Sequence, residues 1–125
     1  MRSKPSRISG IGIDIVDLDR AARFVRDHGG RLDRFLLPHE YRRFRRSRSR
    51  AAAFALYFAA KEAVSKALGQ SIQVPAEFRR YSVHVEGSRW HARAALPSGK
   101  KARFCLRPFR LEGSIGVLAF AQPVR

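Results

Sequence analysis

Cysteine is nearly absent from this sequence, in which Cys105 is the single example. One cysteine excludes a disulfide framework within the chain and a cysteine-rich zinc site. Cys105 lies in the strand-like run ARFCL, with no histidine beside it in the sequence. We therefore interpret it as a small buried hydrophobic residue and not as a nucleophile.

Acidic residues are also scarce, with 10 Asp and Glu against 26 Lys and Arg and a formal net charge of +16. Such a surface attracts nucleic acid, an anionic membrane, a phosphorylated cofactor or an acidic protein. Lysine is rare among the basic residues, which makes each lysine more informative than an arginine. The lysines are Lys4, Lys61, Lys66, Lys100 and Lys101.

Long apolar runs are missing as well. The longest, residues 51–60, is too short to span a bilayer. The stretch ISGIGIDIVDLDR carries acids where a secretory signal has its apolar core, so we expect a cytoplasmic protein without a membrane segment.

The 125 residues, 45% of them hydrophobic, suit one small domain. We predict a flexible arm at residues 1–7 and a single domain at residues 8–125. A domain of this size leaves much surface exposed, and oligomerisation would complete its burial.

A strand is predicted at residues 8–16, where side chains alternate between two faces. Ile11, Ile13 and Ile15 share one face, and Asp14 lies on the other. The glycines at positions 10 and 12 weaken a strand and indicate a close approach of another backbone.

Helices are expected next. Asp17 is a candidate N-cap for a helix that closes at residues 29–30, and Pro38 suits the first turn of a helix in the mostly helical stretch 31–49. A long helix follows at about residues 51–68 and ends at Gly69. Its i, i+4 spacing aligns Phe54, Phe58, Glu62 and Lys66 in one row.

Strands dominate after Gly69. Alternating patterns predict strands at residues 81–86, 90–94, 101–107 and 115–121, with a loop around Pro108 and Gly113 between the last two. The order of strand, helices and β-meander predicts an α+β domain in which an antiparallel sheet packs on the long helix.

Two segments could carry chemistry. Asp14 is an isolated carboxylate on an apolar strand, which suggests a metal or partner, although a strand edge or helix cap accounts for it equally well. Glu62 and Lys66 could form a surface ion pair worth about 0.3–0.5 kcal/mol. In a helix so rich in Ala, Phe and Tyr, however, Glu62 could hold a hard cation while Lys61 and Lys66 hold phosphate oxygens, since Mg²⁺ takes one or two carboxylates with phosphates and water.

These segments resemble a known family. GIGIDIVDLDR at 10–20 and FAAKEAVSKALG at 58–69 resemble the G-x-D-x-V-x-x-x-R and F-x-x-K-E-A-x-x-K-A-x-G signatures of the holo-acyl-carrier-protein synthase group of 4′-phosphopantetheinyl transferases. The resemblance extends over roughly residues 8–69 and implies that fold.

The resemblance implies Mg²⁺-dependent transfer of 4′-phosphopantetheine from coenzyme A to a serine of an acidic acyl carrier protein, with release of 3′,5′-ADP. It implies a homotrimer with active sites between subunits. It assigns the metal to Asp14 and Glu62, and catalysis to these two carboxylates and Lys66. The implied coenzyme A contacts are Lys61, Ser65, Lys66 and Gly69, and the implied carrier-protein contacts are Arg20, Arg23 and Arg26.

The sequence departs from the family in two places. Leu56 and Tyr57 stand where the family has Gly-Arg, and RFCLRPFRLEGSIGVLAFA lacks the family's histidine motif. Arg107 or Arg110 could replace the missing anion contacts, or could be solvated loop arginines. A second hypothesis is therefore a binding module for coenzyme A or carrier protein without turnover.

The basic tract RRFRRSRSR at 42–50 motivates a third hypothesis, an RNA-binding protein. No nucleic-acid fold signature accompanies the tract, and a solvated helix end or part of a coenzyme A phosphate site explains it as well. The presence of both carboxylates and both lysines favours the transferase.

Overall fold

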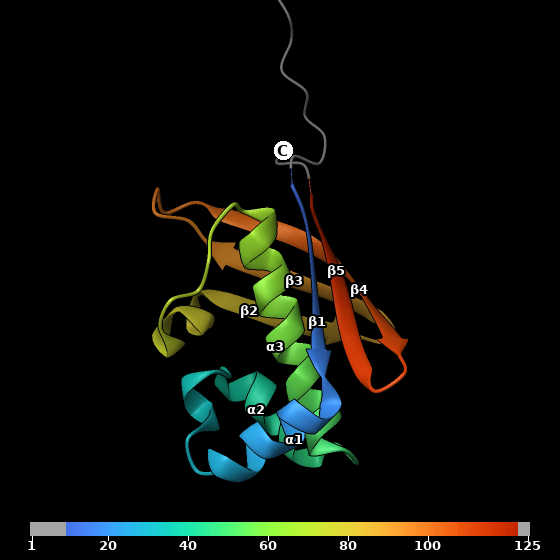
Figure 1. The fold of residues 1–125 in the computed structure, drawn as a ribbon. Helices are drawn as coiled ribbons and strands as arrows, with labels where there is room; N and C mark the ends of the chain where they lie inside the picture. Colours follow the sequence, from blue (N-terminus) through green and yellow to red (C-terminus); the bar gives the residue numbers. More distant parts are fainter. Residues whose placement is uncertain (1–9, 123–125) are drawn as a thin grey trace, which may run out of the picture.

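An antiparallel sheet wrapped around one long helix forms the structure, a computed structural model that describes residues 10–122 (Figure 1). Its five strands lie in the order β1-β5-β4-β3-β2. The strands are β1 (Ile11–Asp17), β2 (Tyr81–Glu86), β3 (Arg89–Ala95), β4 (Lys101–Leu111) and β5 (Ser114–Ala121). The helices are α1 (Leu18–Asp27), α2 (Pro38–Arg46) and α3 (Arg50–Ala67), with short 3-10 helices η1 (Leu32–Arg34) and η2 (Pro75–Arg80). This is the predicted α+β arrangement, while the arm predicted at residues 1–7 lies outside the described residues.

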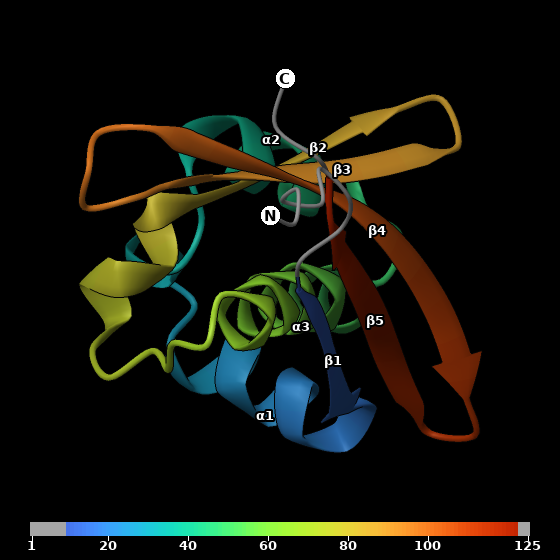
Figure 2. The same ribbon diagram turned by 90° about the horizontal axis from the view of Figure 1, so that it is seen from above.

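Strand β1 lies directly against α3 (Figure 2). A Cβ atom at Gly12 would lie 1.9 Å from the carbonyl oxygen of Ala63, and one at Gly10 would lie 2.2 Å from that of Ala67. Only glycine permits this approach, which confirms the predicted close contact of backbones. As a result, Asp14 is held beside the last turns of α3.

The helix boundaries follow local signals that the sequence displays. Asp17 caps α1 by accepting a hydrogen bond from the amide of Arg20 at 3.0 Å, and Pro38 is the first residue of α2. Helix α3 ends before Gly69, whose φ of 72° suits glycine. No helix in the described part of the chain combines the length and apolar character needed to cross a membrane.

The stretch 31–49 is mostly helical, as predicted, and its helices η1 and α2 are separated by residues 35–37. One prediction of local structure was wrong. Strand β4 continues through Pro108 and turns at residues 112–113. Pro108 is tolerated because pairing with β3 stops at Leu106, so that within residues 10–122 β4 pairs with β5 alone at Pro108.

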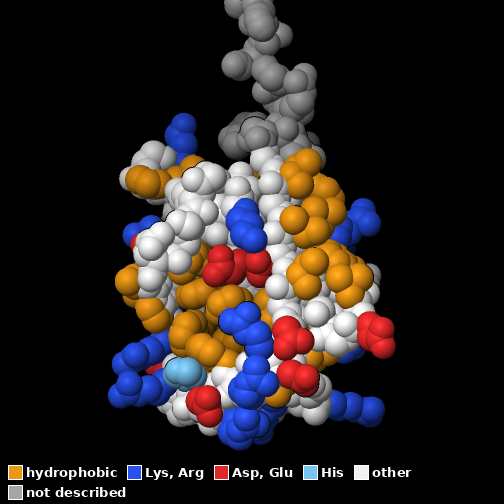
Figure 3. All heavy atoms as spheres, in the orientation of Figure 1, with side chains coloured by type: hydrophobic (Ala, Val, Ile, Leu, Met, Phe, Trp, Pro, Cys, Tyr) orange, Lys and Arg blue, Asp and Glu red, His pale blue; other side chains and the backbone are white. Residues whose placement is uncertain are grey.

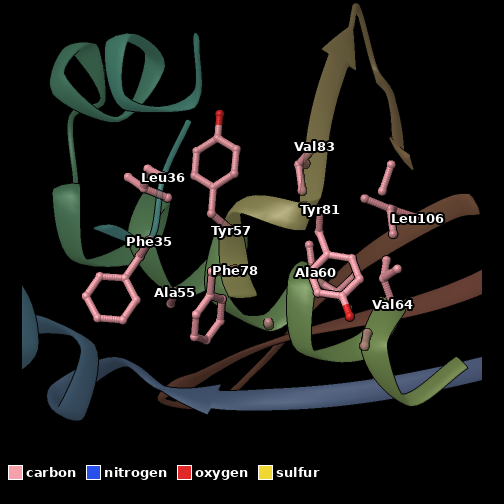
Figure 4. Packing of buried hydrophobic residues seen from close by; sticks show 14 of the residues in the cluster. Phe35, Leu36, Ala55, Tyr57, Ala60, Val64, Phe78, Tyr81, Val83 and Leu106 are labelled. Carbon is pink, nitrogen blue, oxygen red and sulfur yellow. The ribbon is translucent and has the colours of Figure 1, made fainter. Parts of the chain in front are cut away.

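The core lies between α3 and the sheet (Figure 4). Ala60 and Val64 of α3 pack towards Val83 and Leu106 of the strands. Phe35 and Leu36, which follow η1, and Phe78 of η2 also belong to this core. Among residues 10–122, three polar side chains are fully buried with this apolar set: Glu40, Lys61 and Ser65.

The other face of β1 carries an exposed apolar row. Ile11, Ile13 and Ile15 are 65%, 48% and 50% exposed, in line with the predicted alternation. Leu118 of β5 is opposite Ile13 in the register and therefore shares this face. An uncovered apolar row of this kind is typical of an association surface.

The contact between β1 and α3 is testable by adding one methyl group. We expect Gly12→Ala to cost about 3 kcal/mol of unfolding free energy, because β1 must move away from Ala63. Urea unfolding followed by circular dichroism measures the loss. Gly30→Ala is the matched control, since nothing lies within 4 Å of its added Cβ. Equal stability of the two variants would contradict the close packing.

Candidate active site

A groove of about 500 Å³ runs between β1, α1 and α3. On the face drawn in Figure 3, acidic and basic side chains lie next to one another beside an apolar surface. Asp14 lines the groove from β1, and the predicted row of α3 supplies Phe54, Phe58, Glu62 and Lys66. One end of the groove is therefore charged and the other is aromatic.

Asp14 and Lys66 form an ion pair at the charged end. Lys66 Nζ donates to Asp14 Oδ1 at 2.9 Å and to the carbonyl oxygen of Ile13 at 3.3 Å. The side chain of Asp14 is 17% exposed and that of Lys66 is 52% exposed, so the ammonium can leave its partner for a ligand. The ion pairs closer than 4.0 Å within residues 10–122 do not include Glu62 with Lys66, so the alternative of an i, i+4 surface pair was wrong.

Glu62 is the second carboxylate of this end. Burial raises the pKa of Glu62, the nearby Asp14 carboxylate raises it further, and Lys66 opposes both effects. Two carboxylates that repel each other in a half-buried groove favour a bound cation. No cluster of three or more His, Cys, Asp or Glu suited to a metal occurs among residues 10–122. Two carboxylates nevertheless match the donor set of Mg²⁺, which draws its other ligands from phosphate and water.

Lys61 does not face the groove, so its prediction as a phosphate contact was wrong. The side chain is completely buried, and Nζ donates to the carbonyl oxygens of Phe35 at 2.9 Å and Phe78 at 3.2 Å and to Glu40 Oε1 at 2.6 Å. All three ammonium donors are used. Burial lowers the pKa of Lys61, while the Glu40 carboxylate opposes that fall.

Glu40, the partner of Lys61, is a residue that the sequence analysis missed. Its Oε1 also accepts from the amide of Leu37 at 2.7 Å, and its Oε2 accepts from the amide of Val83 at 2.7 Å. The position of Glu40 two residues after Pro38 signals a helix start that a carboxylate can cap. That local signal does not reveal a lysine 21 residues away.

The two remaining predicted coenzyme A contacts lie outside the groove lining. Ser65 is buried and its hydroxyl donates to the carbonyl oxygen of Glu62 at 2.7 Å, which contradicts its prediction as an accessible ligand contact. Gly69 is exposed just after α3 and stays a prediction.

Helix α1 forms the other wall of the groove. Arg20 and Arg23 line it, whereas Arg26 is exposed on α1 outside the lining. Phe24 and His28, which the sequence analysis did not single out, also line the groove. The Phe24 ring stacks on His28 at 4.1 Å and on Phe54 at 5.1 Å, which builds the aromatic end.

A second hollow, of about 540 Å³, lies between the first half of α3 and strands β3, β4 and β5. Tyr57, which replaces the family's arginine, lines it, and burial raises the pKa of this phenol to about 12. Arg110 also lines the hollow, with Arg43, whose guanidinium lies 5.6 Å from the Trp90 ring centre. Arg107 is exposed and is not part of this lining.

Sequence comparisons place these features in a family. The model of the 4′-phosphopantetheinyl transferase superfamily matches residues 10–112. A holo-[acyl-carrier-protein] synthase of Rhodopseudomonas palustris is 41% identical over 102 residues, which cover 77% of this chain and 72% of the relative. One of Alkaliphilus oremlandii is 41% identical over 66 residues, covering 53% of this chain and 54% of the relative. The chain thus spans about half of one relative and nearly three quarters of the other.

Solved structures share the fold. The holo-ACP synthase of Plasmodium yoelii superimposes with a TM-score of 0.74 at 20% identity, over 94% of this chain and 97% of that one. The Neisseria meningitidis synthase gives 0.71 at 26% identity, over 92% and 98%. The Bacillus anthracis synthase, solved in complex with coenzyme A (3′,5′-ADP), gives 0.70 at 23% identity, over 94% and 99%.

The buried pair of Glu40 and Lys61 can be tested by charge removal. Glu40→Gln leaves an ammonium in the core without a carboxylate, and we expect a loss of about 3 kcal/mol of unfolding free energy. Adding Lys61→Met removes that ammonium and should recover part of the loss. Urea unfolding of the single and double variants measures the coupling, with Lys101→Met, at an exposed strand position, as the control. Strictly additive losses would show that the pair is not coupled.

Proposed function

Because the chain belongs to the 4′-phosphopantetheinyl transferase superfamily, we propose that it transfers 4′-phosphopantetheine from coenzyme A to a serine of an acyl carrier protein. The observation that carries the proposal is the meeting of Asp14, Glu62 and Lys66 in one groove. They come from two motifs that lie far apart in the sequence. An ion pair alone needs only two of these groups, whereas phosphate chemistry with a metal uses all three.

Asp14 and Glu62 are the residues that would hold Mg²⁺. When bound, the ion supplies positive charge to the pyrophosphate of coenzyme A and to the charge that develops during displacement. Lys66 adds a mobile ammonium at the same end, which can move from Asp14 to a phosphate oxygen. Exposed Gly69 stays our proposal for a further coenzyme A contact at the end of α3.

Glu62 is also placed to accept a proton. It is half-buried in the groove with Asp14 and Lys66, and a positioned carboxylate can act as a general base. In the proposed step, the serine oxygen forms a bond to the phosphorus that carries pantetheine. The bond from this phosphorus to the bridging pyrophosphate oxygen breaks, 3′,5′-ADP leaves, and the serine proton moves to Glu62.

The wall formed by α1 suits an acidic partner. Arg20 and Arg23 line the groove beside the proposed reaction centre, and Arg26 extends the positive surface along the helix. A carrier protein with acidic residues around its serine would be drawn to this wall by its charge. We propose these arginines as its docking contacts.

We further propose a homotrimer that covers the row of Ile11, Ile13 and Ile15. Each of these residues is about half exposed or more, on the outer face of the sheet. Removing this apolar surface from water would favour association.

Transfer is tested by the intact mass of an apo acyl carrier protein after incubation with this protein, coenzyme A and Mg²⁺. We expect a gain of one phosphopantetheine that EDTA abolishes. Asp14→Asn and Glu62→Gln should each slow transfer about 100-fold or more, because each removes a charge needed by the metal or the proton transfer. Asp33→Asn, a carboxylate outside the groove, is the matched control. No gain while coenzyme A still binds would favour the binding-module hypothesis, which the loss of arginine at Tyr57 motivates.

The trimer is tested by placing a charge in the apolar row. We expect Ile13→Glu to shift the protein to monomers in sedimentation velocity, because a carboxylate would be desolvated on association. Val74→Glu is the control, since Val74 is 52% exposed and lies far from β1 in the sequence, before η2. If Ile13→Glu sediments like the unchanged protein, this face is not the interface.

A further inference from the structure

Three of the four histidines stack in a row that belongs to neither hollow. The rings of His39 and His84 are 4.8 Å apart and 9° from parallel, and those of His84 and His91 are 5.1 Å apart and 19° from parallel. They come from α2, β2 and β3, and His84 lies directly opposite His91 in the strand register. Parallel rings do not direct their nitrogens at one point, and no metal-binding cluster occurs among residues 10–122.

The first histidine attaches α2 to the edge of the sheet. His39 Nε2 lies 2.9 Å from the carbonyl oxygen of Val83, which can only accept, so this nitrogen carries a proton. The neighbouring Glu40 accepts the amide of the same residue. Strand β2 is the last strand of the sheet, so these two side chains occupy backbone groups of Val83 that another strand would otherwise bond.

The middle ring, His84, lies among other titratable and charged side chains. Burial lowers the pKa of His84, and the groups around it lower it further. Its charged and titratable surroundings are His39 and Glu40 from α2, His91 and Arg93 from β3, and Glu86 of β2, whose carboxylate lies 3.6 Å from His91. On the neighbouring strand β4, Cys105 is paired with His91 and Arg103 is paired with Arg93. Glu40 opposes the fall of the His84 pKa, but its carboxylate is already bonded to Lys61.

We propose that His39, His84 and His91 form a proton-sensitive latch, which holds α2 on the edge of β2 while the rings are neutral and releases it when they are protonated. Neutral rings stack at their observed separation without repulsion. A second positive charge in the row would lie about 5 Å from the first, inside the range at which screening by salt is weak. His39 is the ring that can move away, because it belongs to a short helix and not to the sheet.

The direction of the pH effect follows from linkage. The pKa of His84 is lower in the folded protein than in the unfolded chain, so the unfolded chain binds more protons. The contribution of this ring to stability is therefore complete above the ordinary histidine pKa of about 6.5 and is lost as the pH falls below it. Release of α2 would also draw Glu40 away from Lys61. Lowering the pH would therefore weaken the buried ion pair as well.

The test is amide hydrogen exchange of α2, measured by mass spectrometry at about pH 7.5 and about pH 5.5, on either side of that pKa, and corrected for the intrinsic effect of pH. We expect residues 38–46 to open about tenfold more often at about pH 5.5. This pH is about one unit below the ordinary histidine pKa, so one proton bound preferentially by the open state shifts the equilibrium about tenfold. Thermal unfolding over the same range should show a parallel fall in Tm.

Two variants separate the latch from general acid sensitivity. His84→Phe keeps a stacking ring without a titrating group, and His39→Gln keeps an amide donor for the Val83 carbonyl. Both should remove most of the pH dependence of α2 exchange. His28→Phe, which removes the one histidine outside the row, should leave that dependence unchanged. Wild-type pH dependence in both latch variants would overturn the proposal, as would an NMR titration in which the His84 pKa is not lowered.

Discussion

The buried ammonium of Lys61 is the constraint on which the rest of the structure depends. An ammonium without water is tolerated only when opposite charge and acceptors surround it. Glu40 and the carbonyl oxygens of Phe35 and Phe78 meet this need, and each belongs to a different segment. The pair therefore fixes the position of α2 and of two connections relative to the middle of α3.

The same constraint sets the rotation of α3 about its axis. Successive residues of an α-helix are about 100° apart, so an inward Lys61 turns Glu62 to a different side. That side is the groove, which Phe54, Phe58 and Lys66 also line at i, i+4 spacing from one another through Glu62. The glycine contact of β1 then brings Asp14 to the same place. The candidate site is thus assembled by two packing requirements that lie outside the site itself.

What could be predicted from the sequence was local or periodic. The alternation of β1, the cap at Asp17, the end of α3 at Gly69 and the row containing Glu62 all follow from patterns within a few turns. The resemblance to the family signature predicted that Asp14 and Glu62, which lie far apart in the sequence, act together. The direction of Lys61 could not be predicted, because α3 is buried on several sides and its periodicity does not single out one face. Its partner Glu40 lies in another helix, and that pairing is set by tertiary packing alone.

The attachment of α2 to Val83 has a consequence for how the protein behaves in a crowded solution. An uncovered outer strand offers a template for the strand of another chain, which is a common beginning of aggregation. Here the side chains of His39 and Glu40 occupy backbone groups of β2 that such a template would use. While α2 is in place, the sheet cannot be extended by a foreign strand bonded at Val83. The helix that completes the core thus also protects the molecule from edge-to-edge aggregation at this border.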